Sequence, residues 1–176
     1  MDAVYQLLQE TSARDLTMEQ VARRAGVGKP TLYKWWPTKA ALIMAMFHER
    51  LAATPEVPNA KTAEGAIRAK MQRLVAELNG LFGKVMAELI AEGQSEPDVL
   101  RDLYDRHISG RRASTVADIE RGKASGEIRP DVDSNLLVDV IFGPVYYRLL
   151  LKLGPLTEEY GDDLVTQAFR GIETTQ

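Results

Sequence analysis

A run of basic residues with no acidic neighbour is the strongest chemical signal in this chain. Between Gln20 and His48 there are five cationic side chains and no Asp or Glu. The cations are Arg23, Arg24, Lys29, Lys34 and Lys39. Hydroxyl and aromatic side chains lie among them, and both ammonium and hydroxyl groups bind phosphate oxygens. The segment therefore indicates a surface that binds a polyanion, most directly duplex DNA.

Local sequence signals predict the helices that would present these groups. Thr17, with Gln20 three residues later, fits a capping box and starts a helix that Gly26 ends, because glycine adopts the left-handed conformation most easily. A short second helix is predicted over 29–35, with Pro30 in its first turn, where a missing N–H costs nothing. Thr38 is expected to cap a longer helix over 39–53. Two short helices joined by a glycine turn form a helix-turn-helix, which reads the major groove.

The rest of the chain also has helical periodicity, and the sequence predicts an all-α protein. A Pro-containing segment, 54–59, is read as a loop between an N-terminal helix-turn-helix domain (1–50) and a C-terminal helical domain (60–176). The head is expected to pack on Val21, Ala22, Ala25, Val27, Leu32, Trp36 and Leu42. Further helices are expected at 2–12, 62–79, 81–92, 97–125 with a bend near Gly110, 134–153 and 157–171. Glu88 and Glu92 are read as part of a solvated face.

Composition limits the classes of function. The 176 residues carry a net charge of −3, yet residues 1–50 hold seven Lys/Arg against five Asp/Glu, and the remainder 15 against 20. A cationic end on an acidic body suits a protein that presents one face to an anion. The chain has no cysteine and only two histidines, far apart, so disulfides, zinc fingers and thiol catalysis are excluded. Neither a metal site, a cofactor nor an enzymatic activity is predicted.

The most apolar region, Leu136 to Leu153, is read as a buried helix and not as a membrane span. It contains three charged residues, Asp139, Arg148 and Lys152, and a Gly143-Pro144 break. One subunit can cover only part of such an apolar circumference, so a partner is expected to bury the remainder.

Two stretches resemble a known family. The sequence AGVGKPTLY at 25–33, followed by WPTKAAL at 36–42, resembles the TetR family of bacterial transcriptional regulators over about residues 3–47. GEIRPD at 126–131 and FGPVYYRLL at 142–150 are similar to one C-terminal subgroup of that family. The resemblance implies a homodimer with DNA-binding heads, linking fourth helices and helical bodies that hold an effector pocket. The lack of cysteine is compatible with a reducing cytoplasm, so a cytoplasmic protein is expected. Effector binding would change the spacing of the heads and release a pseudo-palindromic operator, and most members are repressors.

The sequence departs from the family pattern at two places. Members usually carry a basic arm before the first helix, whereas this sequence starts almost inside that helix, so no contacts are assigned to an arm. Position 28 is Gly where the family often has a small polar helix cap; glycine is an acceptable cap and costs only tenths of a kcal/mol.

Eight residues are the candidates for DNA contact. Lys29 and Lys34 would reach guanine or a phosphate, and Pro30 and Thr31 match positions that touch base edges or thymine methyl groups. Tyr33 and Lys39 are expected to bind phosphates, the latter helped by backbone N–H groups at the start of the fourth helix. Two residues remain open: Thr17 either binds a phosphate or only caps its helix, and Trp35 either contacts DNA or is structural.

Residues of the body are assigned to a pocket and to a dimer interface. An apolar or aromatic effector is expected because the region is rich in Met and Leu. The candidate pocket residues are Met71, Phe82, Met86, Tyr104, His107 and Tyr147. Two C-terminal helices from each subunit are expected to form a four-helix interface. Its candidate residues are Leu137, Ile141, Val145, Leu150, Leu164, Ala168 and Phe169.

Two other readings stay open at this point. The protein could bind DNA without an effector, as a constitutive regulator or an activator. It could also be a helical interaction module whose head no longer binds DNA.

Overall fold

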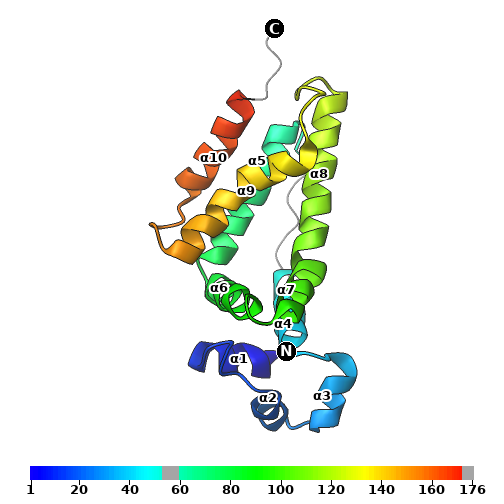
Figure 1. Cartoon of the computed structure of the whole chain (residues 1–176), viewed down its shortest axis with the longest axis vertical. Coiled ribbons are helices and arrows are strands. Elements are labelled where there is room, and N and C mark those ends of the chain that lie inside the picture. Colours follow the sequence, from blue (N-terminus) through cyan, green and yellow to red (C-terminus); the bar gives the residue numbers. More distant parts are fainter. Residues whose placement is uncertain (53–59, 172–176) are drawn as a thin grey trace. The chain divides into compact units, whose positions relative to one another are not determined.

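The computed structural model describes residues 1–52 and 60–171, and every element in these ranges is helical (Figure 1). The predicted all-α fold is confirmed. In chain order the elements are α1 (Asp2–Glu10), α2 (Met18–Ala25), α3 (Lys29–Trp35), α4 (Lys39–Ala52), α5 (Ala63–Leu78), α6 (Leu81–Gly93), α7 (Pro97–Leu103), the π-helical turn η1 (Tyr104–Ile108), α8 (Ser109–Ala124), α9 (Ser134–Leu151) and α10 (Glu158–Arg170).

The chain forms two compact units. One, here called the head unit, contains α1 to α4 together with α6, α7 and η1. The other, the body unit, contains α5, α9, α10 and nearly all of α8. The helices that follow the helix-turn-helix in sequence are thus shared between the units, and α6 and α7 belong to the same unit as the helix-turn-helix.

The start and end of α2 follow from contacts within one helical turn. The Gln20 amide N–H donates to Thr17 Oγ1 at 3.2 Å, and the Thr17 N–H donates to Gln20 Oε1 at 2.7 Å. At the other end Gly26 has φ +66°, and its N–H reaches the carbonyls of Ala22 and Arg23. The predicted capping box and glycine terminus are both confirmed.

The core of the head unit contains most of the residues that were expected there. Val21, Leu32 and Leu42 are buried, as is Ala22. The expectation for Ala25 and Val27 was wrong, because both are exposed, Val27 at 41%. They flank the left-handed Gly26, where the chain leaves α2 and turns toward α3, so their side chains face outward. The remaining core candidate, Trp36, is only half-buried.

A π-helical turn interrupts the helical stretch that begins at Pro97. The Ser109 N–H reaches back to the Tyr104 carbonyl, five residues earlier. Such a turn inserts one extra residue into the helix and shifts the faces that follow. Here His107 lies inside, with its ring centroid 4.8 Å from that of Phe82, and Tyr104 is exposed. The irregularity expected near Gly110 therefore occurs one turn earlier.

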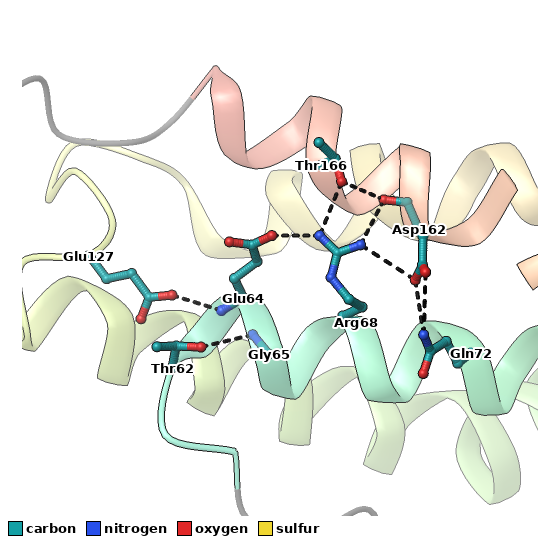
Figure 2. Close-up of polar contacts among 8 residues, drawn as sticks. All are labelled: Thr62, Glu64, Gly65, Arg68, Gln72, Glu127, Asp162 and Thr166. Atoms are coloured by element: carbon teal, nitrogen blue, oxygen red, sulfur yellow. Dashed lines mark hydrogen bonds and ion pairs between the residues drawn. The ribbon is translucent and has the colours of Figure 1, made fainter. Parts of the chain in front are cut away.

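In the body unit, α10 packs tightly along α5. A Cβ added at Gly161 of α10 would lie 2.9 Å from Met71 Cγ of α5, so only glycine permits this approach. Arg68 of α5 fastens the same pair of helices (Figure 2). Its guanidinium donates to the Asp162 carbonyl and to Thr166 Oγ1, both at 3.1 Å, and pairs with Glu64 at 2.5 Å.

The GEIRPD stretch caps the N-terminus of α5. Gly126 has φ +79°, which lets the chain turn sharply after α8. The Glu127 carboxylate then accepts the N–H groups of Ala63 and Glu64, at 2.7 and 2.8 Å. Thr62 caps the same end through a bond from the Gly65 N–H, at 3.1 Å (Figure 2). Together with the buried Ile128, these contacts give the motif a structural role.

Helix α9 runs without a break through Pro144. By length and composition it is the one helix among the described residues that could cross a membrane, with a mean hydropathy of 1.2. Only one face of α9 is buried, through Leu137, Val138, Ile141 and Val145. The other face carries exposed apolar residues, namely Leu136, Val140, Tyr147, Leu150 and Leu151. One face of α9 is therefore exposed in the protomer, as expected for an apolar helix that one subunit covers only in part.

Candidate nucleic-acid interface

Helix α3 is anchored by one buried residue, and its other side chains are exposed to solvent. Leu32 anchors it in the head core at 6% exposure. Gly28 is its N-cap and provides no side-chain hydrogen bond, and Pro30 lies in the first turn. Lys29, Pro30 and Thr31 are all exposed. The N-terminal end of α3 therefore has the geometry of a recognition helix, whose first residues reach base edges.

Lys29 is paired with an acid of the neighbouring helix. Its ammonium donates to Glu19 Oε1 of α2 and lies 5.8 Å from the centroid of the Tyr33 ring. The hydrogen bond raises the pKa of Lys29 and lowers that of Glu19. Both side chains are well exposed, at 44% and 62%, so the pair is weak and Lys29 can exchange Glu19 for another acceptor.

Aromatic side chains stand exposed beside the cations. Trp35 is 66% exposed and Tyr33 45%. The Lys34 ammonium lies 5.9 Å from the centroid of the Trp35 ring. Large aromatic residues gathered on a surface mark a site of interaction. Together with Lys29, they give the exposed side of α3 the mixture of cation, hydroxyl and ring that contacts nucleic acid.

Thr17 has its hydroxyl engaged in the cap. Its Oγ1 accepts the Gln20 N–H and lies 3.0 Å from Gln20 Oε1, as a donor to it. Capping accounts for both of these contacts, and a phosphate would have to displace the Gln20 side chain. Thr17 is nonetheless exposed, on the same helix-turn-helix as Lys29.

Lys39 lies differently from the other candidates. Its ammonium is 3.0 Å from Glu92 Oε1 and donates to the Arg14 carbonyl at 3.0 Å. The Lys39 side chain is only 20% exposed and that of Glu92 14%. The residue is thus at the start of α4, as expected, but its charge is directed into the protein.

Three carboxylates bind groups near the two ends of the helix-turn-helix in the head unit. The sequence did not predict these contacts. Glu88 Oε2 accepts the Ala13 N–H at 2.6 Å, Glu92 pairs with Lys39, and Asp102 accepts the Thr38 hydroxyl. The reading of Glu88 and Glu92 as a solvated face was wrong, because α6 packs against α1, Glu88 accepts the Ala13 N–H ahead of α2, and Glu92 pairs with Lys39 of α4. Their i, i+4 spacing shows that they share a helix face, but nothing in the sequence identifies what lies opposite.

The candidate effector residues fall in both units. In the head unit, Phe82, Met86 and His107 are buried, and the Phe82 ring packs edge-on against Phe47 with a centroid distance of 5.0 Å. Tyr104, from the same unit, is 49% exposed. In the body unit Met71 is fully buried, whereas Tyr147 is 59% exposed. The structure therefore brings Phe82 and His107 into contact.

The candidate interface residues divide between core and surface of the body unit. Leu137, Ile141, Val145 and Phe169 are buried in the protomer's own core. Leu150 is 40% exposed, and Leu164 and Ala168 are half-buried. The periodic sequence marked the apolar positions, but it did not separate those that face α5 and α10 from those that face outward.

Comparison with known proteins agrees with this geometry. Residues 1–46 match the family described as "Bacterial regulatory proteins, tetR family", and residues 57–168 match "Tetracyclin repressor-like, C-terminal domain". The chain belongs to the TetR family. It is a DNA-binding transcriptional regulator and not an enzyme.

Individual relatives extend over nearly the whole chain. The HTH-type transcriptional regulator YdeS of Bacillus subtilis is 34% identical over 175 residues, which cover 99% of this chain and 88% of YdeS. The crystal structure of the TetR-family regulator SCO0332 superposes with a TM-score of 0.82 at 32% identity, covering 98% of this chain and 95% of that one. FadR of Bacillus subtilis, solved with stearoyl-CoA, has the same fold with a TM-score of 0.72 at 19% identity, covering 98% of this chain and 97% of FadR.

Proposed function

We propose that this TetR-family regulator is a cytoplasmic homodimeric repressor that binds a pseudo-palindromic operator and is released by a small apolar or aromatic effector. The observation that carries the DNA-binding part is the exposed side of α3, where Lys29, Tyr33 and Trp35 stand together around a single buried anchor, Leu32. The repressor role is supported by the family to which residues 57–168 belong.

In this proposal α3 enters the major groove. Lys29, Pro30 and Thr31 would reach base edges, because they form the exposed first turn of the helix. Tyr33 and Lys34 would contact phosphates, with Trp35 against the backbone and Lys39 near a further phosphate. Thr17 would add its hydroxyl only after leaving Gln20.

Dimerisation would use the outward face of α9. Leu136, Val140, Gly143, Tyr147 and Leu150 recur at the spacing of one helix face, and all are exposed. A contiguous apolar stripe of this kind is costly in water and is normally covered by a partner. Because Leu137, Ile141, Val145 and Phe169 fill the protomer core, the proposed interface uses this outward face, which includes Leu150, together with Leu164 and Ala168 of α10. A two-fold dimer also matches the symmetry of a palindromic operator.

The effector part rests on the family and on the apolar character of the body. Candidate contacts are Phe82, Met86, Tyr104 and His107 in the head unit, and Met71 and Tyr147 in the body unit. FadR, which shares the fold, was solved with stearoyl-CoA. A ligand with a long acyl chain in a related fold supports an apolar effector for this protein.

Selection of genomic fragments by the purified protein tests the proposal. The protein should enrich fragments that share a pseudo-palindrome, with half-sites about one helical turn or a multiple apart. Binding should weaken steeply with salt, because each neutralised phosphate releases counterions. Apolar and aromatic compounds should then dissociate the complex. Enrichment of no common sequence would contradict operator binding, and a complex that no such compound dissociates would favour a ligand-independent regulator.

A further inference from the structure

Acidic side chains from α6 and α7 occupy the cationic start of α4 within the head unit. Glu92 Oε1 lies 3.0 Å from Lys39 Nζ, and the same ammonium donates to the Arg14 carbonyl at 3.0 Å. The neighbouring Thr38 hydroxyl donates to Asp102 and accepts the Ala41 N–H at 2.9 Å. Two residues at the N-terminal end of α4 are therefore bound to carboxylates of the same chain.

A helix N-terminus with a lysine attracts anions, since its free N–H groups and dipole add to the ammonium charge. A DNA phosphate is one such anion. Glu92 supplies the same chemistry from inside the protein, because a carboxylate oxygen and a phosphate oxygen accept the same hydrogen bond from an ammonium. In the free protein, Glu92 therefore engages part of the charge and hydrogen-bonding capacity of the Lys39 ammonium that a phosphate would use.

We propose that Glu92 competes with DNA for Lys39 and so limits operator affinity. Lys39 binds a phosphate only when its side chain swings away from Glu92. This inference rests on the proposed DNA contact of Lys39. The exchange is unfavourable for two reasons. The pair is largely shielded from solvent, so salt screens it little. Its separation would also leave a shielded carboxylate without its counter-charge.

The cost of separating Glu92 from Lys39 depends on the other groups around the Glu92 carboxylate. Its second oxygen, Oε2, is buried and accepts no hydrogen bond from any residue that the structure describes. Lys39 is thus the one cation paired with this carboxylate in those same parts of the chain. If Lys39 leaves, Glu92 loses its ion pair, and a shift of α6 that moves Glu92 relative to α4 would change the balance between the two states.

The test compares Glu92→Gln with the wild type. Glutamine keeps the shape of the side chain and removes its charge. The matched control is Glu96→Gln, which makes the same charge change four residues later at an exposed N-cap that forms no side-chain hydrogen bond. Binding is measured by fluorescence anisotropy as a function of salt. The probes are a labelled operator duplex from the fragment selection and a shuffled duplex of equal length.

We expect Glu92→Gln to bind both duplexes about three- to tenfold more tightly, which corresponds to about 0.7–1.4 kcal/mol. The slope of log affinity against log salt should steepen by up to about 1, since Lys39 engages a phosphate more fully. Glu96→Gln should change neither quantity. The gain should vanish in the double variant Lys39→Met/Glu92→Gln. Glu92→Ala, which leaves no amide at the site, should reproduce the gain if the glutamine variant does not fold.

Three results would overturn the inference. Weaker binding by folded Glu92→Gln would mean that Glu92 orients Lys39 toward the phosphate. A gain that survives without Lys39, or that appears equally in Glu96→Gln, would be a general effect of charge. Failure of the wild type and of every variant to bind either duplex at low salt would instead remove DNA binding itself, and is recognisable because no variant would then differ from another.

Discussion

Two glycines of α8 provide a controlled test of the packing in the body unit. Gly122 is buried where α8 meets the start of α5 and the turn that follows α8. A Cβ at this position would lie 2.7 Å from Ala63 Cβ and 2.8 Å from Ile128 Cδ1. Gly110 lies in the same helix, but a Cβ there would meet no atom within 4 Å. The same substitution, Gly→Ala, therefore meets close neighbours at Gly122 and open space at Gly110.

The magnitudes follow from this geometry. Alanine stabilises a helix interior by about 0.8–1 kcal/mol relative to glycine, so Gly110→Ala should raise the free energy of unfolding by about that amount. Gly122→Ala gains the same term and loses about 1–3 kcal/mol to overpacking. The Ala63 Cβ is fixed to the backbone and cannot rotate away, so a cost toward the upper end of that range is expected. Gly122→Ala should be less stable than Gly110→Ala by about 1–3 kcal/mol.

Urea unfolding followed by circular dichroism, at matched protein concentration, measures both variants against the wild type. A difference of this size corresponds to about 2–12 °C in Tm for a chain of this length. Equal stability of the two variants, or greater stability of Gly122→Ala, would refute the close packing of α8 on Ala63 and Ile128. The capping of α5 by Glu127, which depends on the same approach, would then be in doubt as well.

Three further predictions concern the DNA contacts, the dimer and pH. Lys29→Ala should change the binding free energy by about 1–3 kcal/mol at particular bases of the operator, whereas Tyr33→Phe should weaken binding to all sequences alike. Both variants are measured on a series of base-substituted operators. A uniform effect of Lys29→Ala across that series would disprove base reading. Leu150→Asp should give monomers or aggregates in analytical ultracentrifugation and abolish tight operator binding. The exposed control Gln6→Asp on α1 should stay dimeric. A dimeric Leu150→Asp variant would mean that the interface lies elsewhere. Burial raises the pKa of the Tyr146 hydroxyl above its ordinary value of 10.0. The stability linked to Tyr146 is therefore intact below pH 10 and is lost as the pH rises further, because the unfolded chain ionises first. Tyr146→Phe should thus lose less stability than the wild type when unfolding is measured from pH 9 to 11, and an unchanged alkaline dependence would contradict this.

The DNA-binding helices were predictable because their signals are local. The Thr17–Gln20 box, the left-handed Gly26 and the Thr38 cap each depend on atoms within about one turn of helix. The sequence therefore located α2, α3 and the start of α4 without knowledge of the rest of the chain. The exposed candidates on α3 follow from the same reasoning, since one buried anchor, Leu32, sets the direction of the remaining side chains.

The face of α9 that packs inside the protomer could not be predicted. Apolar residues occur on all sides of this helix, so periodicity marks no preferred face. Burial of Leu137, Ile141 and Val145 was decided by the packing of the body unit, in which α5 and α10 cover one side of α9. The outward face, with Val140 and Tyr147, is identifiable only once that packing is known.

The fold class and the helix-turn-helix could be predicted from the sequence alone, because capping, turn and periodicity signals act over three or four residues. The family was suggested separately, by the resemblance of the motifs at 25–42. Tertiary structure alone decided what opposes each charged side chain. Lys39 looked like a free phosphate ligand, yet it is bound to Glu92, and Glu88 reaches the Ala13 N–H across 75 residues of sequence. Pairing over such separations leaves no local pattern, because it depends on how whole helices pack and not on the spacing of residues along any one of them.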